Sequence, residues 1–228
     1  MADGGTRSER TYRAMRADIL AGRLRPGDKL PFTELAERYE ASQGVLREGL
    51  SRLVAEGLVV SEPQLGYRVM SLSVKDLEDL TAARCEIEGA AIRHSIAHGD
   101  VAWEASVVAA HHTLERTPEQ DPDDPESISD DWAAAHGAFH RSLLAACPNE
   151  RLKAIAMSLR DSAEVYRRWS VALAHHERDV PAEHRRLLDA VLHRDAEEAV
   201  AALVDHLRTT QVTLLTDATP VAGDVPAR

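Results

Sequence analysis

The stretch 42–59 limits the fold of this chain more than any other, because it predicts one helix that leads directly into a β ribbon. Ser42 can cap the start of the helix by accepting a hydrogen bond from a free backbone N–H. Gly57 suits its end, where a residue of left-handed conformation is common. Between them, apolar residues recur at helical spacing, namely Leu46, Leu50, Leu53 and Val54. The helix therefore has one face for a hydrophobic core.

The opposite face of the first turns carries Gln43, Gly44 and Arg47. These residues are polar or have no side chain. A helix end without bulky apolar groups is what the major groove of DNA admits. The pattern therefore predicts a recognition helix.

Two helices and a hairpin are predicted around this recognition helix. Apolar spacing predicts a helix over 7–22 and a short second helix over 32–39, with a turn at Arg25–Asp28 between them. Two β-rich runs within 58–70 enclose a tip that ends in Gly66. Helix, helix, recognition helix and two-stranded wing is the order of a winged helix-turn-helix domain.

Four spaced segments resemble the N-terminal domain of GntR-family transcription regulators. They are Leu24–Leu30, Glu34–Glu37, Val45–Leu50 and Glu56–Val59. The resemblance implies DNA contacts from the starts of the second and third helices and from the wing glycine, which are Thr33, Ser42, Gln43, Gly44, Arg47 and Gly66. Many members have arginine where this chain has Thr33 and Gln43. Because Gln reads adenine edges and Arg favours guanine, we expect an operator that differs from the commonest family consensus.

The formal charge of −11 belongs to the later part of the chain. Residues 1–70 hold 11 Lys and Arg against 10 Asp and Glu, while the remainder holds 16 against 28. All 11 histidines lie after residue 93. DNA binding needs a local basic surface rather than a basic protein, so the overall acidity does not exclude it. Two parts of different chemistry are predicted.

Several classes of protein are excluded by composition. No run of 18 apolar residues predicts a membrane span, and residues 1–5 lack the apolar segment of a secretory signal. Cys85 and Cys147 do not form a disulfide framework, which fits a reducing cytoplasm. We therefore expect a cytoplasmic protein of mainly α fold. Its predicted parts are a winged helix-turn-helix domain at 1–72, an all-helical effector, metal-binding and dimerisation domain at 73–216, and a flexible tail at 217–228.

The second part begins with a predicted helix over 73–97, whose inner stripe places Arg84 one turn before Glu88. An arginine on a core-facing stripe needs an anionic partner. Glu88 can supply it, which would make the pair structural. Alternatively, Arg84 binds the carboxylate of a small effector in a central cavity. The spacing leaves both interpretations open.

Histidines are numerous in the helices that follow. His111 and His112 are neighbours on a predicted helix over 101–116, and neighbouring helical residues point about 100° apart, so we expect both to be solvated rather than to chelate one ion. His136 and His140 are four residues apart and project from one helix face.

Two more histidines, His184 and His206, lie on apolar stripes of two later helices. Burying uncompensated imidazoles is costly. Together with His136 and His140 they can form a metal site, for which all-nitrogen ligation suits zinc, nickel or a similar divalent ion. They can also form a hydrogen-bonded polar network. We favour metal ligation.

This second part resembles the FCD effector domain of the FadR subgroup of the GntR family. The matching segments are Ala83–Glu88, Phe139–His140, Asn149–Leu152, Glu183–His184 and Asp205–Leu207. The resemblance implies a helical bundle that holds a metal ion and senses small organic acids, with His140, His184 and His206 as ligands. The fourth ligand of the family is usually aspartate, at the position of His136. Together with Gly66–Val69, the pattern is most similar to the CsiR-type branch, whose members respond to glutarate-related hydroxy acids.

These patterns predict a homodimeric transcription regulator, a repressor rather than an activator, that binds a pseudo-palindromic operator in double-stranded DNA. An organic acid would contact the metal ion and Arg84 and so change operator binding. A second hypothesis is a metal-dependent hydrolase built on the histidine bundle, although no His-Glu-x-x-His helix or nucleophile elbow is present. A third is a structural DNA-binding protein without an effector.

Overall fold

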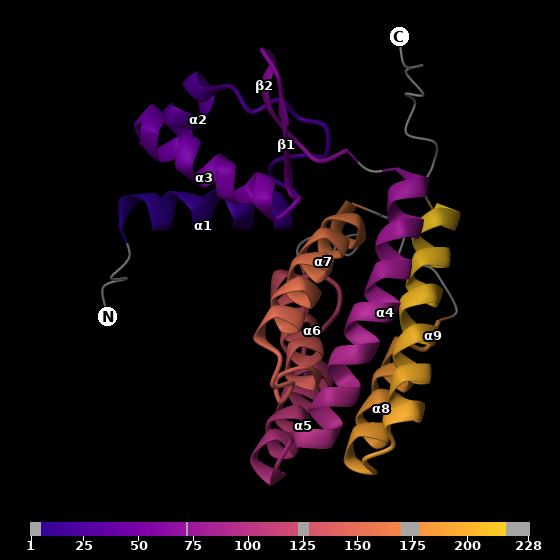
Figure 1. The fold of residues 1–228 in the computed structure, drawn as a ribbon. Helices are drawn as coiled ribbons and strands as arrows, with labels where there is room; N and C mark the ends of the chain where they lie inside the picture. The colour runs from indigo at the N-terminus through magenta and orange to yellow at the C-terminus, as the bar shows by residue number, and fades with distance from the viewer. Residues whose placement is uncertain (1–5, 72, 123–127, 170–177, 218–228) are drawn as a thin grey trace. The chain divides into compact units, whose positions relative to one another are not determined.

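The computed structural model describes residues 6–71, 73–122, 128–169 and 178–217. Two compact units divide them. The first unit holds the described residues up to Ile87 together with Glu150–Trp169, and the second unit holds those of 88–149 and those after the gap that ends at 177. The described fold is mainly α, with one two-stranded sheet, as predicted (Figure 1).

The first unit begins with the predicted winged helix-turn-helix. Its elements are α1 (Arg7–Leu20), α2 (Phe32–Arg38), α3 (Gln43–Ala55), β1 (Val59–Glu62) and β2 (Gly66–Val69). Ser42 caps α3 by accepting a hydrogen bond from the backbone N–H of Val45, and Gly57 has a φ of +77° where α3 ends. The strands pair antiparallel, with Val59 opposite Val69. The elements of the predicted DNA-binding part are confirmed in order and type.

The core of this part lies between α1 and α3. Met15 and Ile19 of α1 are buried together with Leu46 and Leu50 of α3. The helices approach closely at Gly49, where an added Cβ would lie 2.5 Å from Cε of Met15. This packing buries one face of α3 and leaves its N-terminal turns exposed.

Helix α7 (Glu150–Trp169) belongs to the same unit as α1, although it follows more than a hundred residues later. Arg16 of α1 forms ion pairs with Glu56, at 3.0 Å, and with Asp161 of α7. The hydroxyl of Tyr166 donates to the carboxylate of Asp76, near the start of α4 (Val74–His98). Polar contacts therefore connect α7 to α1 and to the beginning of α4.

One expectation for α7 is wrong. Helical spacing predicts that Leu152, Ile155, Ala156 and Leu159 face inward, but half of the surface of Ile155 is exposed. Among the described side chains of α7, the buried residues are Ala156, Val165, Tyr166 and Arg167. The inner stripe of α7 thus passes through Ala156, and Ile155 lies about 100° around the helix from it.

The second unit is a helical bundle. It consists of the later part of α4 with α5 (Val101–Arg116), α6 (Asp130–Leu143), α8 (Val180–Leu192) and α9 (Ala196–Asp217). Side chains of Asp100, Ser129, Asp179 and Asp195 cap the starts of the last four helices. Helix α5 packs on α6 and α8, and α8 packs on α9. Val107, Phe139, Leu187 and Leu203 form the centre of the apolar core.

Two regions of the sequence-based prediction are not tested by these elements. The predicted tail at 217–228 lies outside the described residues except for Asp217, the last residue of α9. The boundary predicted at residue 72 falls on a position that is not described, and it stays a prediction. Among the described helices, none is long and apolar enough to cross a membrane.

Candidate metal centre and nucleic-acid interface

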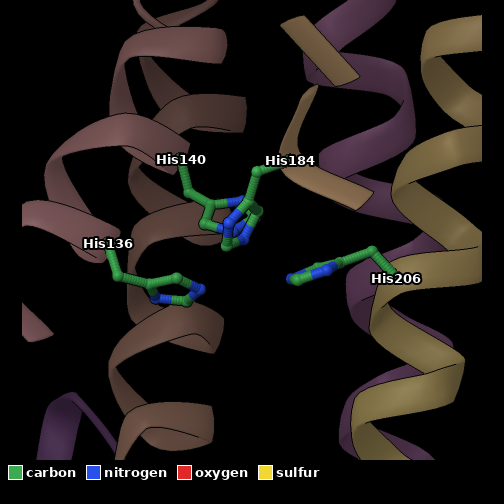
Figure 2. A group of neighbouring side chains, drawn as sticks. All are labelled: His136, His140, His184 and His206. Carbon is green, nitrogen blue, oxygen red and sulfur yellow. The ribbon is translucent and has the colours of Figure 1, made fainter. Parts of the chain in front are cut away.

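Four histidines meet in the interior of the second unit. Figure 2 shows His136 and His140 of α6 directed toward His184 of α8 and His206 of α9. All four are buried, and one ring nitrogen from each lies within 4.8 Å of the other three. The structure therefore brings together the residues that the sequence pattern grouped.

Aromatic rings line this histidine cluster on the side of α6. Trp132 stacks on His136, with 4.8 Å between ring centroids and 15° between ring planes. Phe139 lies 5.4 Å from the ring centroids of both His140 and His184. The imidazoles thus have little freedom to rotate away from one another, which favours a preformed site.

A carboxylate orients one of the four rings. Oε2 of Glu183 lies 2.7 Å from Nδ1 of His206, and the guanidinium of Arg178 binds Glu183 at 2.7 Å. Burial alone would raise the pKa of Glu183, but hydrogen bonds from Arg178 and His206 outweigh it and lower this pKa to about 2. In a neutral His206, the proton on Nδ1 then leaves the lone pair on Nε2. This is the outer-shell arrangement common around metal-ligating histidines.

The surroundings of His184 favour a role as a metal ligand. Burial, reinforced by the nearby His206, lowers the pKa of His184 to about 2, so its ring is neutral. Its Nε2 is buried and has no hydrogen-bond partner among the described residues. A buried nitrogen without a partner costs free energy, and a neutral imidazole nitrogen is the commonest protein ligand for metals. The residues present fit a divalent ion of borderline type.

His111 is where the sequence-based expectation is wrong. It was predicted to be solvated, but it is only 7% exposed, and its ring meets Phe139 edge-on at 5.2 Å. The reason is that His111 continues the buried stripe of α5 through Val107 and Leu114. His112 is exposed, as predicted.

A cavity of about 140 Å³ lies beside the histidine cluster. Its lining residues are His111, Leu114, Glu115, Thr117, Glu119, Trp132, Val180, Pro181 and His184. Among them, Glu115 and Pro181 are exposed, whereas Trp132 and His184 are buried. The cavity therefore extends from the surface to a member of the cluster.

Arg84 and Glu88 are both buried on α4. Their burial agrees with the predicted inner stripe. The structural pairing and the effector-binding role of Arg84 both remain predictions.

The predicted DNA-contacting residues all lie on the surface of the first unit. Thr33 is the second residue of α2. Ser42 caps α3, and Gln43, Gly44 and Arg47 lie in its first turns. Each of these, and Gly66 on the wing, is exposed. A Cβ at Gly44 would have no heavy atom within 4 Å. The N-terminal end of α3 is therefore open to a partner.

Two arginines of α3 have different surroundings. The guanidinium of Arg47 lies 5.6 Å from the ring centroid of Phe32, a contact that can hold it in place without neutralising it. Arg52 lies over the ring of Tyr12 and forms an ion pair with Glu9 at 2.6 Å. Arg52 thus contributes to the packing of α1 on α3, while Arg47 is presented at the exposed end.

Glu183 and Arg178 are site residues that were not predicted from the sequence. Glu183 precedes His184 in one of the segments that resemble the FCD domain, but no spacing rule assigns it a contact with a ring on another helix. Arg178 lies just before α8, where periodicity gives no signal.

Comparison with known proteins identifies both parts of the chain. Residues 7–69 match the family described as bacterial regulatory proteins, gntR family, and residues 79–209 match the FCD domain. The chain is 38% identical over 201 residues to an uncharacterized HTH-type transcriptional regulator, BphR of Paraburkholderia xenovorans, covering 88% of this chain and 82% of that protein. It is 37% identical to the HTH-type transcriptional repressor GlaR of Escherichia coli, covering 87% and 91%.

A solved structure shares the fold of this chain. The structure of McbR/YncC from E. coli superposes with a TM-score of 0.76, at 17% identity, over 93% of this chain and 98% of the other. At that identity the likeness extends to the fold alone.

Proposed function

Because the chain belongs to the gntR family of bacterial regulatory proteins and carries an FCD domain, we propose that it is a homodimeric repressor that is controlled by a small organic acid and a bound metal ion. It is a DNA-binding transcription regulator and not an enzyme, since its family and its relatives are transcription regulators. The hydrolase hypothesis is therefore wrong. Because a regulator of this kind acts on the chromosome, its proposed location is the cytoplasm.

In the proposed complex, the exposed end of α3 enters the major groove of a pseudo-palindromic operator. Gln43 and Arg47 read base edges, while Thr33, Ser42, Gly44 and Gly66 approach the DNA closely. Two copies related by a two-fold axis set the spacing of the half-sites. The exposure of all six residues supports this role. The name of GlaR as a repressor supports the sign of regulation.

The four clustered histidines are proposed to hold one divalent ion, with zinc and nickel as the best candidates. The observation that carries this proposal is the buried Nε2 of His184, which has no hydrogen-bond partner in the part of the chain that the structure describes. Glu183 would hold His206 in the ligating orientation. An ion that takes more than four ligands would keep positions for water or for the carboxylate of an effector.

The effector is proposed to be a small organic acid whose carboxylate contacts the ion and Arg84. An effector changes operator affinity only if it binds one state of the dimer more tightly than the other. The same coupling requires operator DNA to change the affinity for the acid by an equal factor.

A melting-temperature screen of organic acids, with and without a chelator, tests the sensor half. Ion binding should raise the melting temperature of chelator-treated protein, and the effector should raise it further only when the ion is present. If no divalent ion shifts the melting temperature, the metal proposal is wrong.

Footprinting tests the DNA-binding half. Arg47→Ala should remove roughly 1–3 kcal/mol of operator binding, the range for one good base contact, without changing the melting temperature. Arg116→Ala, which removes the same charge from an exposed position on α5, is the matched control and should bind normally. Normal footprinting by Arg47→Ala would remove the recognition helix from the proposal.

A further inference from the structure

The cavity beside the histidine cluster joins two chemically different ends. The exposed carboxylate of Glu115 and the half-buried Glu119 lie among its outer residues, and the buried imidazoles of His111 and His184 lie among its inner ones. His184 belongs to the cluster itself, whereas His111 is outside the group of four whose nitrogens converge. His111 thus has no part in the metal centre as proposed above.

The chemistry of this lining suits a cation better than an organic acid. Glu115 is paired with Arg185 at 2.6 Å, so the preference for a cation comes from the imidazoles at the inner end rather than from the carboxylates at the mouth. Further in, an imidazole nitrogen is a suitable ligand for the borderline ions that fit the cluster. A volume of about 140 Å³ holds a partly hydrated ion with several waters.

Phe139 gives His111 a defined place relative to the cluster. Its ring lies 5.2 Å from that of His111 and 5.4 Å from that of His184. Both imidazoles are therefore held against the same aromatic side chain, and both line the same cavity.

We propose that this cavity is the route by which a divalent ion enters the histidine cluster, with His111 as a transient ligand that passes the ion to His184. The inference rests on the proposed metal site. It adds a binding role for a residue outside that site.

A route residue and a permanent ligand have different kinetic effects. Removing a group that binds the ion only in passing raises the barrier in both directions, so association and dissociation slow by the same factor and the dissociation constant is unchanged. Removing a permanent ligand weakens equilibrium binding and speeds dissociation. The two roles can therefore be separated by measuring both rates.

The experiment uses the full-length protein, freed of metal with a chelator and mixed rapidly with Ni²⁺. Quenching of tryptophan emission gives the signal, because Trp132 stacks on His136 and reports an ion in the cluster. Dissociation is measured by mixing the loaded protein with excess chelator. His111→Leu should slow both rates by roughly tenfold, which corresponds to an activation free energy that is about 1.4 kcal/mol higher. His112→Leu changes the exposed neighbour and should leave both rates as in the wild type.

His111→Gln keeps a polar side chain at the buried position and serves as a second variant if leucine disturbs the fold. It should show the same equal slowing, to a smaller degree. Loading of both His111 variants at the wild-type rate would overturn the route while leaving the metal site intact. Weaker equilibrium binding with faster dissociation would make His111 a permanent ligand and would also overturn it. If the wild type takes up no Ni²⁺, the metal site and the route fall together.

Discussion

The two functional regions of this protein place polar side chains in opposite environments. At the recognition surface, Gln43, Gly44 and Arg47 are exposed, and the apolar face of the same helix supplies the stability. In the histidine cluster, the functional groups are themselves buried among core residues such as Phe139 and Leu187. Substitutions at the surface should therefore change function without loss of stability, whereas substitutions in the cluster should lower function and stability together.

Among the tests of this contrast, removing the metal ion should change stability the most. An ion present at about 1,000 times its dissociation constant stabilises the folded state by roughly 4 kcal/mol, which for a chain of this size corresponds to roughly 8–16 °C in melting temperature. Calorimetry with and without chelator measures the shift. Arg47→Ala should show the same shift as the wild type, because its site is separate. An unchanged melting temperature after chelation would count against a stabilising ion.

The carboxylate beside the cluster should have the next largest effect. Glu183→Gln removes the charge that orients His206, and loss of such an outer-shell partner lowers metal affinity roughly 10–100-fold. Competition with a chromophoric chelator measures the affinity. The control is Glu198→Gln, which breaks an exposed ion pair with Arg186 and should leave affinity unchanged. Equal affinities for both variants would show that His206 does not depend on Glu183.

In the metal-free protein, a lower pH should affect the stability contributions of the two regions differently. Because burial lowers the pKa of His184 to about 2, the unfolded chain binds more protons than the folded one below about pH 6.5. The contribution of His184 to the free energy of unfolding is therefore fully present above about pH 6.5. It decreases as the pH falls, by about 2 kcal/mol at pH 5. Burial of His111 lowers its pKa as well and acts in the same direction.

In the first unit, Asp18 provides the comparison for this titration. Burial opposes ionisation there, but hydrogen bonds from Tyr39 and Arg23 outweigh it and lower the pKa of Asp18. Its contribution is present above about pH 4 and is lost only below that. Urea unfolding at pH 7 and pH 5 should thus show a loss that comes from the histidines. Equal stability at the two pH values would contradict the buried neutral state of His184.

The smallest effect is expected at Gly44. Its surroundings leave room for a methyl group, and replacing a helical glycine by alanine adds up to about 1 kcal/mol of stability. Gly44→Ala should therefore unfold at higher urea concentration yet bind the operator less well, because the methyl group occupies space that the DNA approaches. Gly49→Ala is the matched variant and should lose stability, since its Cβ would meet Met15. Unchanged operator binding by Gly44→Ala would remove Gly44 from the interface.

Features governed by local sequence were the ones that could be predicted. The cap at Ser42, the stop at Gly57 and the outward face of α3 follow from neighbouring residues. The histidine cluster could also be predicted. The spacing of His136 and His140 puts them on one helix face, and the apolar stripes around the other two histidines fix which faces those occupy.

Features that depend on tertiary packing were missed. The prediction that His111 is solvated rests on its adjacency to His112, but His111 lies on the same buried stripe of α5 as Val107. The contact of Glu183 with His206 joins two helices, and the ion pair of Arg16 with Asp161 joins residues 145 apart in sequence. No local pattern contains that information.

The placement of α7 in the first unit has a practical consequence for exchanging sensors between relatives. A chimera cut just after the wing would keep Arg16 but replace Asp161, whereas Asp76 and Tyr166 would both come from the parent that donates the sensor. A hybrid regulator should therefore retain Asp161 from the parent that donates the winged helix. Grafts that restore this residue should fold and bind DNA where simple fusions do not.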